Sequence, residues 1–246
     1  MNEPRQTLIA QRLANRFGGP LPANAPVRFE DSPVTEGLLD HLREHLTAGE
    51  THYTARPGVP ELRSAIGREI GEVGGVKRDA DGVIVTHGEG EALYVTLLGL
   101  GLGTGSSIAI SGGCRHTALL NLLDIRMVGQ GDPEATEAQA IYSELGPDPT
   151  KLARSETEGR IEIIALGGWL FSAAARSSET VLPPDGEILI GHLDSIPGLD
   201  HFRIGFVAGP PETVKRIQTW KQALSICTAG PSQRAALFAI GEENQS

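Results

Sequence analysis

Short apolar runs alternate along the chain with segments whose apolar residues recur at helical spacing. Residues 161–166 form one such run, rich in isoleucine, whereas Leu62, Ile66 and Ile70 share one helical face within residues 61–73. Strands are expected near 83–86, 107–111, 162–166, 187–193 and 203–207. Because these runs are apolar on both faces and are separated by helices, they predict an α/β fold of three layers, with helices on both faces of a mainly parallel sheet.

Helical spacing predicts four further helices, at 91–101, 114–125, 210–226 and 231–243. Polar and turn-forming residues dominate 129–160, which favours an irregular excursion from the core over a boundary between domains. We therefore expect a single domain over 1–246, in which 1–26 is an N-terminal extension and 27–246 is the core.

Composition excludes some partners. The 246 residues, 39% of them hydrophobic, can bury a full core, and their formal net charge is −10. That charge argues against nucleic acid and against an anionic membrane as partners, because both need clustered Lys and Arg. No apolar run approaches the roughly 18 to 20 residues of a membrane span, and the N-terminus lacks a basic-then-apolar signal, so we expect a cytoplasmic protein. The two cysteines, Cys114 and Cys227, are too few for a disulfide framework and predict ordinary buried thiols.

Two blocks of sequence resemble a known family. Residues 52–70, HYTARPGVPELRSAIGREI, hold a Tyr-x-x-x-x-Gly stretch before a Pro-x-Leu-Arg helix, and residues 81–101 hold a strand, a Thr-x-Gly turn and a helix with Ala-Leu. In this order the features resemble the N-terminal half of the class I/II aminotransferases, the large pyridoxal-phosphate fold. The resemblance extends from about residue 27 to about residue 241, and it implies the large domain of these enzymes with the small domain missing.

Residues 191–205, GHLDSIPGLDHFRIG, resemble the family's lysine strand and the turn that follows it. In the family, a lysine eight positions before an arginine holds the cofactor as a Schiff base, and counting back from Arg203 gives Ser195. A serine hydroxyl cannot form an imine, so the resemblance implies no catalytic residue here and no resident pyridoxal phosphate. All the lysines lie outside this strand, namely Lys77, Lys151, Lys215 and Lys221.

Other motifs of the family are absent. Its stacking aromatic should follow the strand at 107–111, where this chain has His116. After 161–166 the family has an Asn-Pro-x-Asn-Pro-Thr-Gly run, whereas residues 167–173 are Gly-Gly-Trp-Leu-Phe-Ser-Ala. The family's next unit is a helix and a strand ending in Asp-Glu-x-Tyr, whose aspartate pairs with the pyridine nitrogen. The segment after Ala173 is too short for this unit, so we expect it to be deleted.

Some parts of the cofactor site survive as candidates. Gly88, Glu89 and Gly90 follow a strand at a turn into a helix, where free N–H groups would cradle a phosphate. Glu89 would repel that phosphate, and its carboxylate could instead stabilise the helix N-terminus. Arg203 corresponds to the family's phosphate-binding arginine and could hold a small anionic ligand. Tyr53 corresponds to the tyrosine that reaches the partner subunit's cofactor, which implies a homodimer.

Three functions remain open. The first is an aminotransferase-like protein that has lost transaminase chemistry and serves in binding or assembly. The alternative is a pyridoxal-phosphate enzyme that holds its cofactor without a covalent bond or borrows a partner's lysine. A second alternative is a metal site in the old cofactor crevice, because polar side chains follow several predicted strands, namely His87, Cys114, His116, His192 and Asp194. These residues lack a recognised ligand spacing, and a catalytic triad of His192, Asp194 and Ser195 is less favoured still, because neighbours on one strand rarely meet its geometry.

Overall fold

The computed structural model describes residues 34–75, 77–145, 160–176, 182 and 187–243. Within them, seven strands form one sheet in the order β1-β7-β6-β5-β4-β2-β3. The strands are β1 (Val83–Thr86), β2 (Ser107–Ser111), β3 (Arg126–Gly129), β4 (Ala140–Glu144), β5 (Ile161–Ala165), β6 (Ile188–His192) and β7 (Gly205–Ala208). β7 pairs antiparallel with both β1 and β6, and the other pairings are parallel. The sheet is therefore mainly parallel, as predicted.

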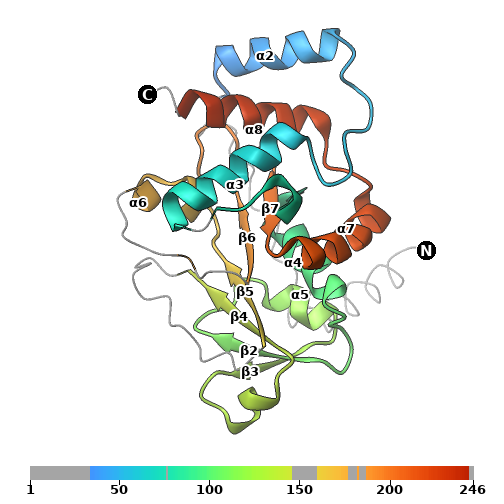
Figure 1. The fold of residues 1–246 in the computed structure, drawn as a ribbon, viewed down its shortest axis with the longest axis vertical. Coiled ribbons are helices and arrows are strands. Elements are labelled where there is room, and N and C mark those ends of the chain that lie inside the picture. The colour runs from blue at the N-terminus through green and yellow to red at the C-terminus, as the bar shows by residue number, and fades with distance from the viewer. Residues whose placement is uncertain (1–33, 76, 146–159, 177–181, 183–186, 244–246) are drawn as a thin grey trace, which may run out of the picture.

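Helices cover both faces of the sheet, as Figure 1 shows. One face carries α3 (Pro60–Gly74) and α8 (Gly230–Glu243), with α2 (Glu36–Thr47) packed on α8. The other face carries α4 (Gly88–Gly99), α5 (Thr117–Leu122) and α7 (Pro211–Ser225). The short helix α6 (Ala173–Arg176) and the 3-10 turns at Ala80–Gly82, Pro133–Glu137 and Trp169–Phe171 complete the described elements.

Alternate side chains of each buried strand serve opposite layers. In β5, Ile164 packs with the α3 and α8 side, while Ile163 and Ala165 pack with the α4 and α7 side, and all three are fully buried. Such a strand is apolar on both faces apart from paired polar residues such as Glu162, which is why the runs in the sequence are nearly continuous rather than alternating. The three-layer α/β fold predicted from these runs is confirmed.

The interpretation of 129–160 as an irregular excursion is wrong where the structure describes it. β4 lies in the interior of the sheet, hydrogen-bonded to β2 on one side and to β5 on the other. β3, at the sheet edge, was also not predicted. Ala140–Ser143 is buried, but the run is short and sits between polar segments, so its pattern carries little signal. Residues 146–159 and the expected extension 1–26 lie outside the described residues.

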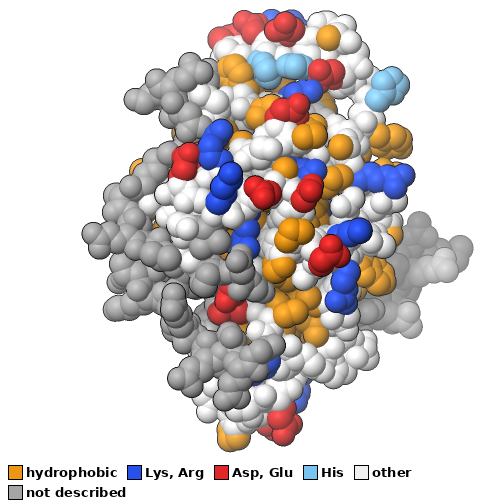
Figure 2. Space-filling view, in the orientation of Figure 1, with side chains coloured by type: hydrophobic (Ala, Val, Ile, Leu, Met, Phe, Trp, Pro, Cys, Tyr) orange, Lys and Arg blue, Asp and Glu red, His pale blue; other side chains and the backbone are white. Residues whose placement is uncertain are grey.

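Two predicted boundaries also shift. β7 begins at Gly205 rather than near 203, because Arg203 adopts a positive φ of 51° that an extended strand excludes. α5 begins at Thr117 rather than 114, because the residues before it form the turn out of β2. None of the described helices is long and apolar enough to cross a bilayer. On the face seen in Figure 2, basic and acidic side chains are interspersed, with no broad basic area.

Candidate functional site

The parallel strands end at one edge of the sheet, and polar residues follow several of them there. We call seven of these residues the carboxyl-edge cluster: Glu89, Arg115, His116, Glu144, His192, Asp194 and Ser195. They lie after β1, β2 and β6 or, for Glu144, at the end of β4. In open α/β sheets this edge is where ligands usually bind.

The turn from β1 into α4 is held by close backbone packing. Gly88 has a φ of +76°, and the Thr86 hydroxyl donates to the Gly88 carbonyl oxygen at 3.0 Å. A Cβ on Gly205 would lie 2.3 Å from the Gly88 carbonyl carbon, so the start of β7 is pressed against this turn. The predicted strand-to-helix turn is therefore present, with α4 beginning at Gly88.

Glu89 turns inward rather than toward solvent. Its side chain is 4% exposed, and its Oε1 lies 2.9 Å from His116 Nε2 and 3.6 Å from Arg115 Nε. Its other oxygen, Oε2, is buried without a hydrogen-bond partner. Burying a carboxylate oxygen without a partner costs free energy. Arg115 and His116, on the β2–α5 turn, offset this cost by pairing with the other oxygen.

Arg115 links Glu89 to Glu144. Its Nε donates to Glu144 Oε1 at 3.1 Å, its backbone N–H donates to the same oxygen, and the Tyr142 hydroxyl donates there at 2.9 Å. A terminal nitrogen of the guanidinium reaches the Ala165 carbonyl oxygen at 3.4 Å. Burial would lower the pKa of Arg115, but the carboxylates of Glu89 and Glu144 raise it above its usual value. Burial would raise the pKa of Glu144, but hydrogen bonds from Arg115 and Tyr142 lower it. Arg115 therefore stays positively charged and is held by its partners at the carboxyl edge of the sheet.

Sequence reasoning missed Arg115 and Glu144. The sequence after β2 predicts a ring that stacks on the cofactor, and only His116 corresponds to it; nothing there predicts a role for Arg115. Glu144 falls in β4, which was not predicted. Their partnership joins residues 29 positions apart and requires β2 and β4 to be neighbours. No local signal in the sequence contains that information.

Gly167, Gly168 and Ser195 meet at the ends of β5 and β6. The Ser195 hydroxyl donates to the Gly168 carbonyl oxygen at 2.7 Å. A Cβ on Gly168 would lie 3.0 Å from that of Ser195, and a Cβ on Gly167, whose φ is +58°, would lie 2.6 Å from a guanidinium nitrogen of Arg115. Side chains at either glycine would therefore displace Ser195 or Arg115.

The deletion expected after Ala173 concerns a segment that the structure describes only in part, since residues 177–181 and 183–186 lie outside the described residues. One strand that was not predicted, β4, precedes β5 and the Gly167–Gly168 pair. The deletion after Ala173 therefore stays a prediction.

The remaining predicted site residues are not all brought together. Asp194 lies 3.4 Å from His192, and burial raises the pKa of its carboxyl, an effect that His192 opposes. Arg203 is exposed near Asp194 and makes no ion pair with another described residue. Tyr53 is 81% exposed and lies on a separate cavity with His87, away from the carboxyl-edge cluster.

The carboxyl-edge cluster does not fit pyridoxal phosphate. Ser195 offers a hydroxyl in place of an amine, and the buried Glu89 carboxylate stands in the turn where a phosphate should dock. Arg115 takes the space beside Gly167, where the pyridine-pairing carboxylate is absent. No metal cluster takes its place, since no group of three His, Cys, Asp or Glu side chains among the described residues could hold an ion.

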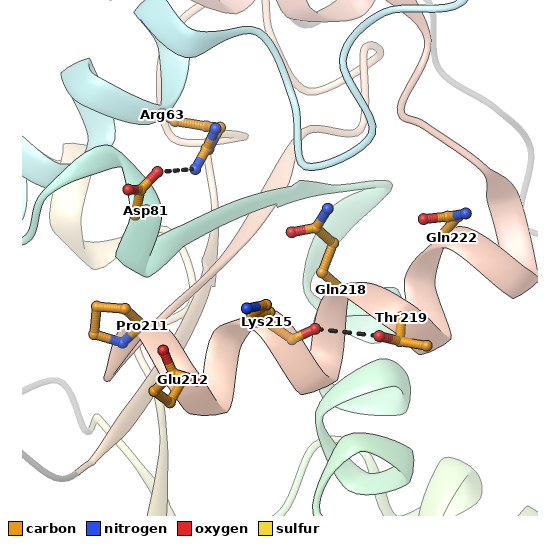
Figure 3. A pocket seen from close by; sticks show the side chains of 8 residues that line it. All are labelled: Arg63, Asp81, Pro211, Glu212, Lys215, Gln218, Thr219 and Gln222. Carbon is orange, nitrogen blue, oxygen red and sulfur yellow. Dashed lines mark hydrogen bonds and ion pairs between the residues drawn. The ribbon is translucent and has the colours of Figure 1, made fainter.

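A second hollow lies at the opposite edge of the sheet. It encloses about 400 Å³ between α7, α3 and the start of β1, and Figure 3 shows the Arg63–Asp81 pair facing the α7 side chains across it. Arg63 also donates to the Val83 carbonyl oxygen at 2.8 Å, so its guanidinium stabilises the entry into β1. Sequence analysis predicted nothing here, and exposed charges of both signs give the hollow no ligand preference.

The curated proteins that match this chain in sequence are aminotransferases. No model of a protein family matches the chain. A probable aspartate aminotransferase of Methanocaldococcus jannaschii is 31% identical over 77 residues, which make up 31% of this chain and 20% of that protein. The bifunctional aspartate aminotransferase and glutamate/aspartate-prephenate aminotransferase of Petunia hybrida is 22% identical over 254 aligned positions, which cover 90% of this chain and 52% of that protein. The chain thus spans about half or less of the length of these curated relatives.

Solved structures agree over most of the chain. A double mutant of the Thermus thermophilus aspartate aminotransferase matches with a TM-score of 0.72 at 20% identity, covering 89% of this chain and 64% of that one. The N-succinyldiaminopimelate aminotransferase of Mycobacterium tuberculosis matches with a TM-score of 0.68 at 22% identity, covering 97% and 70%. At these identities the likeness concerns the fold, and this chain has the fold of the large domain of the class I/II aminotransferases.

Proposed function

We propose that this chain uses the aminotransferase fold for binding or assembly and does not carry out pyridoxal-phosphate transamination. The observation that carries the proposal is the network in which the partly exposed Arg115 bridges the buried Glu89 and the partly buried Glu144. This network lies between the β1–α4 turn and the end of β5, which are the elements that would hold the phosphate and the pyridine ring.

Each part of the network opposes the cofactor for a separate reason. A phosphate monoester carries a charge of about −1.5 to −2, and at about 4 Å two unit charges of like sign repel by about 4 kcal/mol in a partly buried site. Glu89 would impose that repulsion at the α4 N-terminus. The Arg115 guanidinium would face the ring nitrogen, where transamination needs a carboxylate that stabilises the protonated form. Restoring a lysine at Ser195 would correct neither defect.

The test is titration of the full chain with pyridoxal phosphate, followed by borohydride reduction and peptide mapping. We expect no saturable aldimine absorption band, because no lysine lies in the carboxyl-edge cluster. Scattered trapping on exposed lysines such as Lys215 would be nonspecific and would not saturate. A saturable band trapped at one lysine would overturn the proposal and favour the alternative, an enzyme that uses a different or a borrowed lysine.

A homodimer belongs to the same proposal. Tyr53 is 81% exposed, and the α7 end presents Leu224 at 52% and Ile226 at 45% exposure. Exposed apolar side chains gathered near one loop are typical of an interface that another surface covers. Sedimentation at micromolar concentration should give a dimer, and Leu224→Glu should shift it toward monomer. A wild-type monomer would count against the assembly role.

Arg203 is the best candidate for a small anionic ligand. Its guanidinium is exposed and makes no ion pair with a described residue, so it is free to bind an oxyanion. Isothermal titration with inorganic phosphate should give weak binding that Arg203→Gln removes. Equal binding by the variant would reject this role.

A further inference from the structure

A cavity of about 530 Å³, whose lining includes no residue of the carboxyl-edge cluster, falls within the usual size range of small-molecule sites. It opens between the loop that holds Tyr53 and the turn that joins α7 to α8. Several side chains that can donate, accept or attack line it, among them His87, Ser225 and Cys227. Nothing in the proposed function uses these groups.

Ser225 is held between a lysine and a glutamate. Its hydroxyl donates to Glu91 Oε1 at 2.6 Å, and Lys221 Nζ donates to the same hydroxyl oxygen at 3.2 Å. Lys221 is fully buried, one helical turn before Ser225. The other oxygen of Glu91 accepts from the His87 backbone N–H at 2.6 Å and lies 3.0 Å from His87 Nδ1. A nucleophile beside a base, with a third group orienting both, is the arrangement that covalent catalysis needs.

The backbone directly after Ser225 is strained. Ile226 has φ 59° and ψ −71°, and the Cys227 N–H donates to the Ser225 carbonyl oxygen at 2.6 Å. This is a tight γ-turn of the rare positive-φ type, and a β-branched residue adopts it only under constraint. Strain of this kind concentrates at functional sites, where it presents a side chain at a fixed angle. Here it ends α7 abruptly and places Ser225 on the cavity.

Helix α8 begins on the opposite wall of the cavity. Gly230, its first residue, lines the cavity together with Ala229 and Pro231. In the first turn of α8, Pro231 has no N–H and the Gln233 N–H donates to the Ala229 carbonyl oxygen at 3.1 Å, which leaves the N–H groups of Gly230 and Ser232 at the positive end of the helix dipole. Negative charge that develops on a carbonyl oxygen in the cavity would be stabilised there.

We propose that Ser225 is the nucleophile of a second site that reacts with small carboxylic esters, with Lys221 as its base. The neutral amine of Lys221 takes the hydroxyl proton as the Ser225 Oγ–acyl bond forms and the ester C–O bond breaks. The alcohol leaves with that proton, and water then hydrolyses the acyl-serine to release the acid. Glu91 orients the serine by accepting its hydrogen bond, and its charge attracts Lys221.

The electrostatics of the cluster agree with these roles. Burial lowers the pKa of Lys221, an effect that Glu91 and Cys227 oppose, so the neutral amine is accessible at a lower pH than for a solvated lysine. Tyr53 lies on the cavity rim, so a second subunit that docks there would form its outer wall. The inference does not depend on whether the carboxyl-edge cluster binds a cofactor.

The test uses the full chain and diisopropyl fluorophosphate, a small serine-directed probe. Attack forms the Oγ–P bond and breaks the P–F bond, so fluoride leaves and Lys221 takes the proton. We expect stoichiometric labelling that maps to Ser225, together with hydrolysis of p-nitrophenyl acetate that the label abolishes. No label, or a label elsewhere, would overturn the proposal without any variant.

Two variants separate chemistry from packing. Lys221→Arg places a long side chain with N–H donors at the same position, but the guanidinium stays protonated and cannot act as a base, so labelling should fall by about 100-fold or more. Thr219→Ala removes another α7 hydroxyl, whose partner is the Lys215 carbonyl oxygen, and should label at the wild-type rate. Wild-type labelling in Lys221→Arg would show that Lys221 only supports the fold and would reject its role as base.

Discussion

Glu91 should make the fold sensitive to acid. Its side chain is only 10% exposed, and its pKa is lowered to about 2: burial works against this shift, but hydrogen bonds from His87 and Ser225 and the charge of Lys221 outweigh it. The ordinary value is 4.5. A pKa lowered on folding contributes stability that is complete above the unfolded value and is lost as the pH falls toward the folded one.

The size of this contribution follows from the shift. A fall from 4.5 to about 2 gives about 3 kcal/mol, at about 1.4 kcal/mol for each pH unit. Glu91→Gln should therefore lower the free energy of unfolding by about 3 kcal/mol near neutral pH, and somewhat more if Lys221 stays charged and unpaired. The loss should shrink as the pH falls below 4.5 and the wild type protonates.

Urea denaturation monitored by tryptophan fluorescence measures this difference at several pH values. Glu44→Gln, an exposed change in α2 at a side chain with no hydrogen bond or ion pair to another described residue, serves as the matched control and should be near neutral throughout. If the wild type and Glu91→Gln differed by a constant amount down to about pH 2.5, the pairing of Glu91 with Ser225 and Lys221 would not be the source of the stability.

Four further changes test the site geometry. Gly205→Ala should destabilise by about 3 kcal/mol or more, because its Cβ would meet backbone, whereas Gly90→Ala, which meets nothing within 4 Å, should stabilise by about 0.5–1 kcal/mol in chemical denaturation. Gly167→Ala should cost about 1–2 kcal/mol, and thermal melts should find a smaller cost in an Arg115→Ala background. Ser195→Lys should give no half-transamination with a panel of amino acids, and turnover would mean that this one position separates the chain from active enzymes.

The strands that are buried on both faces could be predicted from sequence. The runs at β1, β2, β5 and β6 are mostly apolar, because both sides of the sheet are covered, and such a run is visible without knowing its neighbours. The glycine turn after β1 and the serine at position 195 can likewise be recognised in the sequence alone, because each depends on one short stretch of residues and on no contact with a distant one.

Other features depended on tertiary structure. β4 is a short run between polar segments, so its burial follows from its place between β2 and β5 rather than from its own pattern. The later strands β5 and β6 nevertheless lie close to their predicted positions, because each is recognised from its own run.

The chemistry of both sites was decided by contacts between distant residues. Glu89 meets His116 at 27 positions of separation, and Ser225 meets Glu91 at 134. A periodic pattern encodes which side of an element is buried, but not which element lies against it. Sheet order and helix packing set those partners, and with them the buried lysine, the paired carboxylates and the pKa values that the sequence alone did not reveal.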